Sequence, residues 1–595
     1  MQISKRSSEC RSADGAESWK NSRRRRALLI AIAIVIVFCA AGSAAWANST
    51  SATIKRIAKT YARDSIQTGG SIGIEIGVVY GAEPPLFVSA GDAIAGRRPF
   101  TPNTIFQIGS VSKVFTTNLL GQSVANGSLQ LSMPLSSFEN EIGPLEPLTA
   151  KITLEELGDF TGGFPTLAEA CGTPPIPGCL PSSRPAIGTY TAQDFAEYFQ
   201  TALPMNFFNN PPTQVSTLPA PYNYSDYSIG LLGLLLGDQS NAPLSNDALT
   251  GWFNAVANQI LTPLAMKSTF LFGPRGARIA NGYEPALANA SVANGEISAV
   301  SVTSPGGLYA SAPRARITGG GGHGARLASA IDGNGRVSSI AVVNPGAGYI
   351  APASVIFTGG GSSTTANGAV IVKNGKVAAI KIIGAGAGYA RVPTVTITGG
   401  RKTKGTDATA VAHLAGGSLS YVEVTSGGSG YVPPLAVIVA PGSETINNIP
   451  IWAPAGALSS SMRDMLGFAA AALGNTTIAK IAVPAAVTNG FAIAETPYAC
   501  SAEDPLLADC PAATAQSALS WSITPAATGD GVPEIVGKNG GISGFSTQVL
   551  LMPSQNLAVV VFANSRQNVP DTESSTAEAD RVARNILFAL FYNLP

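Results

Sequence analysis

One short motif in the sequence has residue types that could perform acyl transfer. Ser110 and Lys113 form the only Ser-x-x-Lys of the chain. The apolar residues after it recur at helical spacing and stop at Asn126-Gly127, a pair that commonly ends helices. On the first turn of that helix, positions i and i+3 share a face, so the Lys113 ammonium can reach the Ser110 hydroxyl. The positive end of the helix favours an alkoxide on Ser110, and a neighbouring base would make it a nucleophile. The alternative is an ordinary Ser-x-x-Lys on a solvated helix face.

Apolar elements must hold this motif in place. The residues just before it, 105–108, are mostly apolar. Gly109 then permits a tight turn from strand to helix, which would point Ser110 into a cleft. Periodicity predicts the remaining elements, which are a helix over 51–66, strands over 72–79, 86–88, 546–552 and 557–563, and helices over 462–473 and 576–592.

Composition excludes several classes of function. The chain has 595 residues, enough for two or more domains, and its net charge of +1 with 12% charged residues gives no sign of nucleic-acid binding. Its two histidines, His323 and His413, lie in a Gly-rich region, so a Ser-His-Asp triad and a His-rich zinc site are both unexpected. We expect no metal and no cofactor. A serine hydrolase of this composition needs a base other than histidine.

The N-terminal residues have the features of an export signal. Residues 1–26 are polar and end in four arginines, residues 27–42 are almost wholly apolar, and Ala45-Trp46-Ala47 follows. This order predicts cleavage after Ala47 and delivery to the periplasm or the outside of the cell. The alternative is an uncleaved anchor, because residues 27–47 are long enough to span a bilayer.

The cysteines after this segment agree with export. Cys171 and Cys179 form one near-neighbour pair and Cys500 and Cys510 another, in Pro- and Gly-rich loops. We predict two local disulfides in an oxidising compartment, the alternative being four free buried thiols.

An internal repeat occupies the middle of the chain. Tyr309, Tyr349, Tyr389 and Tyr431 end Gly-rich turns at steps of 40, 40 and 42 residues, and the same apolar pattern precedes each of them. Residues 290–448 are therefore predicted to form an all-β module of four units, the last one degenerate. The module is either a spacer that adds stability or a binding module that holds an envelope polymer through exposed turn tyrosines.

Three segments in this order resemble the penicillin-recognising serine hydrolases, in particular the class C β-lactamases and D-alanyl-D-alanine carboxypeptidases. They are Ser110-Val111-Ser112-Lys113, Tyr224-Ser225-Asp226 and Lys538-Asn539-Gly540-Gly541. The resemblance implies an α+β protein with the β-lactamase-type fold, in which an antiparallel sheet from the two chain ends packs with helices beside a mostly helical domain. Here an all-β repeat module interrupts it. The expected division is 1–47, export signal or membrane anchor; 48–289 and 449–595, the two parts of the β-lactamase-like domain; and 290–448, the insertion.

The resemblance also implies a role for each site residue. Ser110 is the nucleophile and Lys113 its partner base. Tyr224 carries the proton to the leaving nitrogen and then activates the deacylating water, if Lys113 and Lys538 lower the pKa of its phenol from about 10. Backbone N–H groups of Ser110 and Gly541 form the oxyanion hole, and Lys538 holds a substrate carboxylate. The substrate-binding set is completed by Asp226, Asn539 and Gly540.

Three residues depart from the family pattern. Asp226 stands where the family usually has Asn, which donates to the substrate amide carbonyl, whereas an ionised Asp can only accept. Asp226 is then either protonated, paired with Lys113 or Lys538, or matched to a different substrate. Asn539 replaces the usual Thr, and Gly541 the usual Ser.

The expected function is that of an exported serine hydrolase that forms an acyl-enzyme and hydrolyses β-lactam or D-alanyl-peptide amide bonds. An esterase of the same fold is one alternative, and a catalytically silent penicillin-binding or envelope-binding protein is another. The expected partner is a small-molecule or peptidoglycan-derived substrate, with an envelope polymer at the repeat insertion if the module binds one. Neither a nucleic-acid partner nor a particular oligomeric state is predicted.

Overall fold

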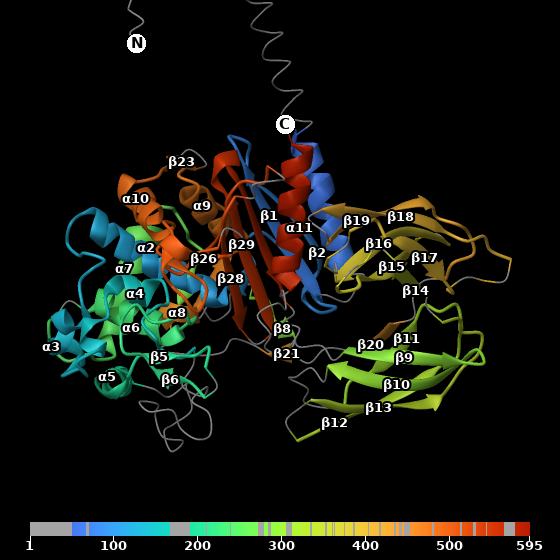
Figure 1. Cartoon of the computed structure of the whole chain (residues 1–595), viewed down its shortest axis with the longest axis horizontal. Coiled ribbons are helices and arrows are strands. Elements are labelled where there is room, and N and C mark those ends of the chain that lie inside the picture. Colours follow the sequence, from blue (N-terminus) through green and yellow to red (C-terminus); the bar gives the residue numbers. More distant parts are fainter. Residues whose placement is uncertain are drawn as a thin grey trace, which may run out of the picture.

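A nine-stranded antiparallel sheet brings together the two ends of the chain (Figure 1). β1 (Gly73–Tyr80) pairs on one side with β2 (Leu86–Ile94) and on the other with β30 (Leu557–Ala563). The sheet predicted to join the two chain ends is therefore confirmed. Its other strands are β3 (Arg98–Pro99) beyond β2, and β29 (Phe545–Met552), β28 (Ile535–Ile542), β27 (Ser522–Thr524), β26 (Gln516–Ser517) and β25 (Ala499–Cys500) beyond β30.

This computed structural model describes residues 50–66, 71–166, 191–271, 279–564 and 578–594. Short stretches inside the ranges 191–271 and 279–564 are excepted, of which the longer are 284–286, 305–311, 445–452 and 527–530.

Helices cover both faces of the sheet. The N-terminal helix, residues 50–66, and α11 (Glu578–Asn593) pack on one face, where strand residues such as Ile76 are fully buried. α9 (Met462–Ala472) packs on the other face against β1 and β30. It comes close because Gly77 of β1 carries no side chain: a Cβ there would lie 2.6 Å from Leu466. The predicted helices at both chain ends and at 462–473 are thus present, with bounds shifted by one or two residues.

A mostly helical region beyond α9 is built around α2 (Ser112–Ala125). Every α2 side chain from Ser112 to Gln122 is buried, because other helices surround it. The backbones of α2 and α10 touch directly, since a Cβ on Gly121 would lie 2.3 Å from the carbonyl oxygen of Gly490. The other helices of this region are α3 (Glu139–Ile142), α4 (Leu154–Gly158), α5 (Ala192–Thr201), α6 (Asp226–Gly237), α7 (Asp247–Val256), α8 (Ala453–Gly456) and α10 (Ala485–Ala494). Of these, α6, α7, α8 and α10 contact α2 directly.

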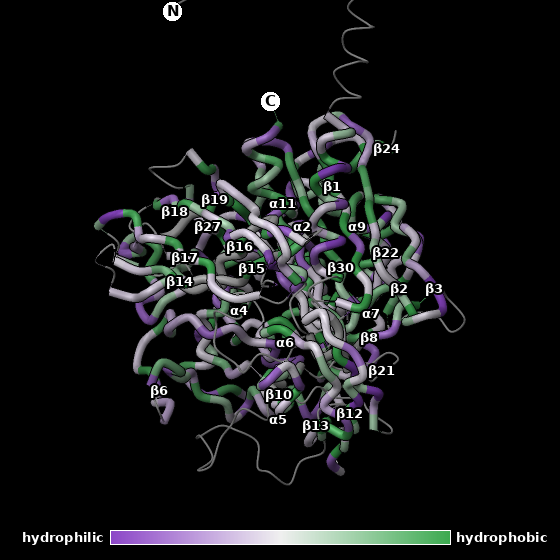
Figure 2. The backbone as a smooth tube through the Cα atoms, turned by 90° about the vertical axis from the view of Figure 1, so that its right-hand side faces the viewer, coloured by the Kyte–Doolittle hydropathy of each residue, from purple (hydrophilic) through white to green (hydrophobic). Residues whose placement is uncertain are grey.

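Several short strands complete this part of the chain. The most important for the site is a three-stranded sheet in which β22 (Leu458–Ser461) lies between β4 (Ile105–Gln107) and β7 (Phe270–Leu271). The tube view in Figure 2 shows hydrophobic stretches of chain through this region, around α9 and β22. The remaining short pairs are β5 (Met205–Asn206) with β6 (Thr213–Gln214), and β23 (Thr477–Ile478) with β24 (Ile481–Ala482).

The inserted module is all β, as predicted, and its four units combine into two lobes (Figure 1). Each unit contributes a hairpin and one short strand. The first lobe contains β9 (Leu287–Ala293), β10 (Glu296–Ser304), β11 (Ala315–Thr318), β12 (Arg326–Ile331), β13 (Val337–Asn344) and β20 (Ala436–Val439). The second contains β14 (Ser354–Thr358), β15 (Asn367–Lys373), β16 (Lys376–Gly384), β17 (Thr394–Thr398), β18 (Thr409–Ala415) and β19 (Ser418–Ser426).

The last unit of the module returns to the first. β20, from the fourth unit, pairs with β11, from the first unit, just as β14 pairs with β17 in the other lobe. At the base of the module, β8 (Gly282–Tyr283) pairs with β21 (Ser443–Glu444). The chain therefore leaves the rest of the protein and re-enters it at adjacent points.

The repeat tyrosines that the structure describes are not exposed, so that part of the polymer-binding expectation is wrong. Tyr349 and Tyr431 are 7% and 3% exposed. Their phenol oxygens accept hydrogen bonds from backbone N–H groups, of Ala325 at 3.4 Å and of Ala408 at 2.9 Å. These rings anchor loops within the module instead of offering a binding surface. The side chains of Tyr309 and Tyr389 lie outside the described residues.

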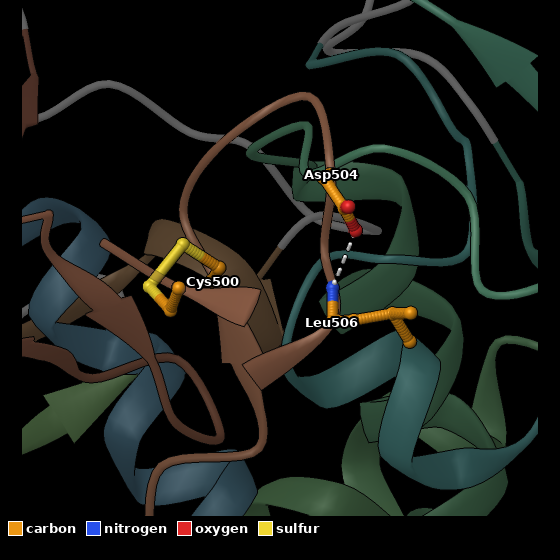
Figure 3. Close-up of a disulfide and its surroundings, with 4 residues drawn as sticks. Cys500, Asp504 and Leu506 are labelled. Atoms are coloured by element: carbon orange, nitrogen blue, oxygen red, sulfur yellow. Dashed lines mark hydrogen bonds between the residues drawn. A yellow bond between two sulfur atoms is a disulfide. The ribbon is translucent and has the colours of Figure 1, made fainter. Parts of the chain in front are cut away.

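Two predictions about export fall partly outside the described residues. The segment 1–47 and the pair Cys171 and Cys179 are among the residues left undescribed. No helix within the described part of the chain is both long and apolar enough to span a membrane. Cys500 and Cys510 are joined by a disulfide, as expected for that pair (Figure 3).

Candidate active site

Ser110 lies at a tight junction between a strand and a helix. β4 ends at Gln107, a single 3₁₀ turn covers Gly109–Val111, and α2 begins at Ser112. Gly109 has φ +52°, a conformation that glycine adopts without strain, so the predicted turn is confirmed. Ser110 therefore lies two residues before the start of α2, and Lys113 lies on the first turn of that helix.

Strand β28 presses against this turn through backbone alone. A Cβ on Gly109 would lie 2.9 Å from the nitrogen of Gly541, and a Cβ on Gly540 would lie 2.1 Å from the carbonyl oxygen of Ile108. Side chains at either glycine would separate the two elements. The absence of side chains brings the Gly541 backbone next to the turn that carries Ser110.

The Lys113 side chain is completely buried and all three of its N–H groups have acceptors. Its Nζ donates to Ser110 Oγ at 3.1 Å and to the Ala455 carbonyl at 2.7 Å. It also forms an ion pair with Asp226 Oδ1. Of the three states open to Asp226 on sequence grounds, the structure contains the pair with Lys113. Burial lowers the pKa of Lys113, and the charge and hydrogen bond of Asp226 act in the opposite direction.

Two lysines approach the ring of Tyr224. The Nζ atoms of Lys113 and Lys538 are 4.8 Å and 4.9 Å from the centroid of its ring. Tyr224 immediately precedes the N-cap of α6, Ser225, whose side chain accepts from Ser228 N at 3.1 Å. The predicted polar junction at the start of a buried helix is therefore present.

The pKa of Tyr224 differs from our expectation. Burial and then the charge of Asp226 raise the pKa of the Tyr224 phenol well above its ordinary value of 10.0, and a hydrogen bond with Ser110 only partly opposes them. The expected lowering by two lysines does not occur, because burial, and after it the charge of Asp226, disfavours the phenolate. Tyr224 is thus a neutral phenol in the resting site.

Lys538 is the second buried amine of the site, and it is not the surface lysine of a strand edge. It is 4% exposed, and its Nζ donates to Asn539 Oδ1 at 3.4 Å. Within the part of the chain that the structure describes, no carboxylate forms an ion pair with it. Burial and the charge of Lys113 lower the pKa of Lys538 to about 7, against a smaller opposite effect of Asp226.

Two site residues were not recognised from the sequence. The ring of Phe160 lies 4.8 Å from that of Tyr224, and Phe160 holds φ +72°, which is uncommon outside glycine. The neighbouring Asp159 is buried, and burial raises its pKa to about 8 although Thr161 donates two hydrogen bonds to it. The second missed residue is Ala455, whose carbonyl accepts from Lys113. The sharp loop of 157–165 and the Gly456 turn were the available signals.

A large open cavity adjoins the site but does not contain Ser110. Its volume is about 800 Å³, and its walls are the β5–β6 hairpin, the segment 215–221 and the loop closed by the Cys500–Cys510 disulfide (Figure 3). Tyr222 N donates to the Ala502 carbonyl of that loop at 3.2 Å. The disulfide loop and the segment leading to Tyr224 are thus directly connected.

The eight residues predicted from the sequence therefore lie together. Ser110, Lys113, Tyr224, Asp226, Lys538 and Asn539 are linked by the contacts above, and Gly540 and Gly541 form the backbone wall beside them. No group of three or more potential metal-binding side chains occurs among the described residues.

Comparison with known proteins defines the class of this chain. The family model described as Beta-lactamase matches residues 58–333 and 388–583, and the chain belongs to this family. The family and the fold class implied by the sequence motifs are thereby confirmed.

Three curated relatives that match this chain are each described as a β-lactamase. One from Escherichia coli (strain K12) is 39% identical over 98 residues, which cover 16% of this chain and 24% of that protein. One from Pseudomonas fluorescens is 28% identical over 253 residues, 41% of this chain and 59% of that protein. The third, from Yersinia enterocolitica, is 25% identical over 222 residues, 37% and 48% respectively. The matches thus span between a quarter and three fifths of the relatives' own length.

Solved structures similar to this chain include a class C β-lactamase in complex with cefoxitin, at 13% identity and a TM-score of 0.49, covering 91% of this chain and 99% of that one. A β-lactamase/D-alanine carboxypeptidase from Pseudomonas syringae has 16% identity and a TM-score of 0.47, with coverage of 91% and 99%.

Proposed function

We propose that this chain is an exported serine hydrolase that forms an acyl-enzyme on Ser110 and hydrolyses β-lactam or D-alanyl-peptide amide bonds. The observation that carries the proposal is the 3.1 Å hydrogen bond from the Lys113 amine to Ser110 Oγ, next to a phenol that also reaches Ser110. A hydroxyl held by an amine and a phenol, without histidine, is equipped for acyl transfer. Membership of the Beta-lactamase family supports the same reaction class.

In the acylation step, Ser110 Oγ attacks the substrate carbonyl as its proton leaves. Lys113 is the nearest base, and its burial eases the loss of a proton from the ammonium. Backbone N–H groups of Ser110 and Gly541 then stabilise the oxyanion, and one such donor is typically worth roughly 10²–10³ in rate. Once Lys113 is charged, it also stabilises the developing alkoxide. The ion pair with Asp226 supports this charged form of Lys113.

Tyr224 relays the proton to the leaving nitrogen and later activates the deacylating water. Because its pKa is raised, the phenol acts in a concerted way: it accepts the proton of one group while giving its own to another. Lys538, the second amine close to the Tyr224 ring, holds a substrate carboxylate while it is protonated. Without bound anion it is a buried charge with no ion-pair partner among the described residues, which favours binding of an anionic substrate.

An esterase is the second candidate, and Asp226 is the observation that favours it. The carboxylate of Asp226 is engaged with Lys113 and cannot donate to a substrate amide carbonyl. Asn539 and Gly541 also lack the hydroxyls usual in the resembling family. An ester needs less help with its leaving group than an amide, so it tolerates these departures better.

We place the enzyme outside the cytoplasm, with residues 1–47 as a cleaved export signal or an anchor. The disulfide of Cys500 and Cys510 fits an oxidising compartment. The division of the chain at residues 289/290 and 448/449 is likewise our proposal. It is supported by the pairing of β8 with β21 close to both boundaries.

The decisive experiment is intact-mass measurement after exposure to a penicillin and, separately, to an activated ester. We expect an adduct with at least one of them in the wild type and none in Ser110→Ala. A long-lived penicillin adduct and a short-lived ester adduct would favour the esterase. If the wild type is modified by neither reagent and hydrolyses neither, the hydrolase proposal is overturned and a catalytically silent binding protein is left.

A further inference from the structure

The two lobes of the inserted module share one backbone scaffold, which allows them to be compared with each other. In the first lobe, a turn ending at Tyr349 is fixed on two sides. Tyr349 N donates to the Gly295 carbonyl at 2.9 Å, and the next residue, Ile350, donates to the Gly320 carbonyl at 2.8 Å. The Tyr349 phenol oxygen accepts from Ala325 N.

The second lobe repeats this scaffold bond for bond. Tyr431 N donates to the Gly375 carbonyl at 3.0 Å, and Val432 N donates to the Gly400 carbonyl at 2.9 Å. The Tyr431 phenol oxygen accepts from Ala408 N at 2.9 Å. Any residue that differs between the two lobes here is therefore not needed to build the turn.

One loop differs in length and in charge. It runs from Gly320 to Ala325 in the first lobe and from Gly400 to Ala408 in the second, where it is three residues longer. The short loop consists of glycines and one histidine between its ends, whereas the long loop carries Lys402 and Lys404, both exposed. Lys402 N donates to the Gly430 carbonyl at 2.9 Å, which holds the loop against the turn before Tyr431.

A third lysine, Lys376, lies beside the same turn. Lys376 is exposed and lies where the first lobe has Glu296. A Cβ on Gly427, in the same turn, would lie 3.2 Å from the Cβ of Lys376. Lys376, Lys402 and Lys404 thus lie on segments that contact one turn, and we call them the lysine cluster. Among the described residues none of the three forms an ion pair. The acidic residue close to them in sequence is Asp407, which interacts with another residue.

The repeat module is positively charged, whereas the rest of the chain from residue 50 onward is negatively charged. Residues 290–448 contain eleven Lys and Arg against five Asp and Glu, a net charge of +6. Residues 50–289 and 449–595 contain eighteen against twenty-eight, a net charge of −10. The chain total of +1 conceals this separation, which would attract an anionic partner to the module and repel it from the rest.

We infer that the lysine cluster is a docking site for a polyanionic polymer, a chain whose repeating units carry phosphate or carboxylate groups. The three side chains are exposed, one at the start of β16 and two on the long loop, and they lie beside a half-buried turn. A polymer places several charges on the cluster at once and gains affinity from their number. The inference replaces the buried tyrosines with lysines as the binding residues, and it does not depend on the chemistry proposed for Ser110.

The test measures binding of fluorescently labelled inorganic polyphosphate to the full chain by anisotropy, at low and at physiological salt. Wild type is expected to bind at low salt and to weaken as salt is added, because screening reduces attraction between exposed charges. The variant Lys376→Glu, Lys402→Ser, Lys404→Ser is expected to lose at least tenfold in affinity. Glu is the residue of the first lobe at the position equivalent to 376, and Lys402 and Lys404 are exposed, so the thermal melting of this variant should not change.

A matched control removes the same amount of charge elsewhere in the module. Arg314→Glu, Arg316→Ser, Arg336→Ser changes three exposed arginines, and less than a twofold loss is expected. Equal losses in the two variants would mean that only net charge matters, and the docking site would be abandoned. The docking site would also be abandoned if the wild type bound vesicles of phosphatidylglycerol but not polyphosphate, or if it bound neither of them. Hydrolysis of a small activated ester should be the same in all three proteins.

Discussion

The ammonium of Lys113 is ion-paired with the carboxylate of Asp226 and, with another of its hydrogens, donates to the Ser110 hydroxyl. Asp226 thereby opposes the loss of charge that burial favours and orients the amine that donates to Ser110. In the resembling family this position usually holds a neutral Asn. The pair therefore decides how far this site can behave as a β-lactamase.

The first prediction concerns Asp226→Asn. The amide restores a donor for the substrate amide carbonyl and removes the charge that raises the pKa of Lys113. We expect kcat/KM for a penicillin to rise about tenfold relative to that for an activated ester, the value of one ordinary hydrogen bond. Stopped-flow acylation with both substrates measures it. Asp247→Asn, at an exposed position, is the control and should change neither. A parallel decrease for both substrates in Asp226→Asn would contradict the role given to the pair.

The second prediction separates Tyr224 from its neighbour. Tyr224→Phe keeps the ring that both lysines approach but removes the phenol oxygen, so proton transfer should slow by roughly 10²–10⁴. Mass spectrometry should then show an acyl-enzyme that persists. Tyr222→Phe should change rates by less than about threefold, because the ring of Tyr222 contacts Phe160 and not the lysines. Equal effects of the two changes would remove Tyr224 from the mechanism.

The third prediction follows from the pKa of Lys538, which is lowered to about 7. The amine is protonated below that pH and neutral above it, so its attraction for a substrate carboxylate is present at low pH and lost as pH rises through about 7. KM for a carboxylate-bearing substrate should therefore increase above pH 7, while KM for an uncharged ester should not. In Lys538→Met the two substrates should show the same pH profile. An unchanged difference between them in that variant would show that another group binds the carboxylate.

The fourth prediction concerns the contact between β28 and the turn of Ser110. Gly540→Ala would put a Cβ 2.1 Å from the Ile108 carbonyl oxygen, and both partners are backbone, so the strand must move away. We expect at least a hundredfold loss of activity, since displacement of the Gly541 N–H removes an oxyanion donor, together with a lower melting temperature. Gly467→Ala, in α9, is the matched control, because its Cβ would meet nothing closer than 4.0 Å. Normal activity of Gly540→Ala would contradict the geometry described here.

The fifth prediction concerns the disulfide loop. Replacing both Cys500 and Cys510 by Ser removes a constraint on a loop of ten residues, which should cost roughly 2–3 kcal/mol of unfolding free energy by the loop-entropy relation. Denaturant unfolding of the double variant measures it. Cys500→Ser and Cys510→Ser alone should each lose a similar amount, since either one breaks the bond. Unchanged stability of all three proteins would show that the loop is held by other contacts, such as that of Ala502 with Tyr222.

Local rules were sufficient for much of the catalytic framework. The spacing of Ser110 and Lys113 on one helical turn, and the glycine before them, depend on a few adjacent residues, and the structure has them as expected. The joining of β1 to β30 could not be derived from spacing. It entered through the resemblance carried by three motifs, and the structure confirms it.

What failed depends on surroundings that a sequence does not display. The pKa of Tyr224 is set mainly by burial and then by the charge of Asp226, and both are properties of the assembled site. The burial of Tyr349 has a similar cause. A Cβ on Gly322 would lie 2.4 Å from the ring of Tyr349, so a glycine distant in sequence provides the space that the tyrosine fills. The closing of β20 onto β11 likewise joins residues more than a hundred positions apart.

The pairing of β8 with β21 has a consequence for how this chain can be rearranged. Because the two strands at the root of the module run side by side, a short turn could connect them in place of everything between. Nothing in the nine-stranded sheet would be pulled out of register by such an excision, and the β1 and β30 partners would meet across a shorter tether at a lower entropic cost of closure. The module could therefore be exchanged for another binding domain without changing the fold of the β-lactamase-like domain.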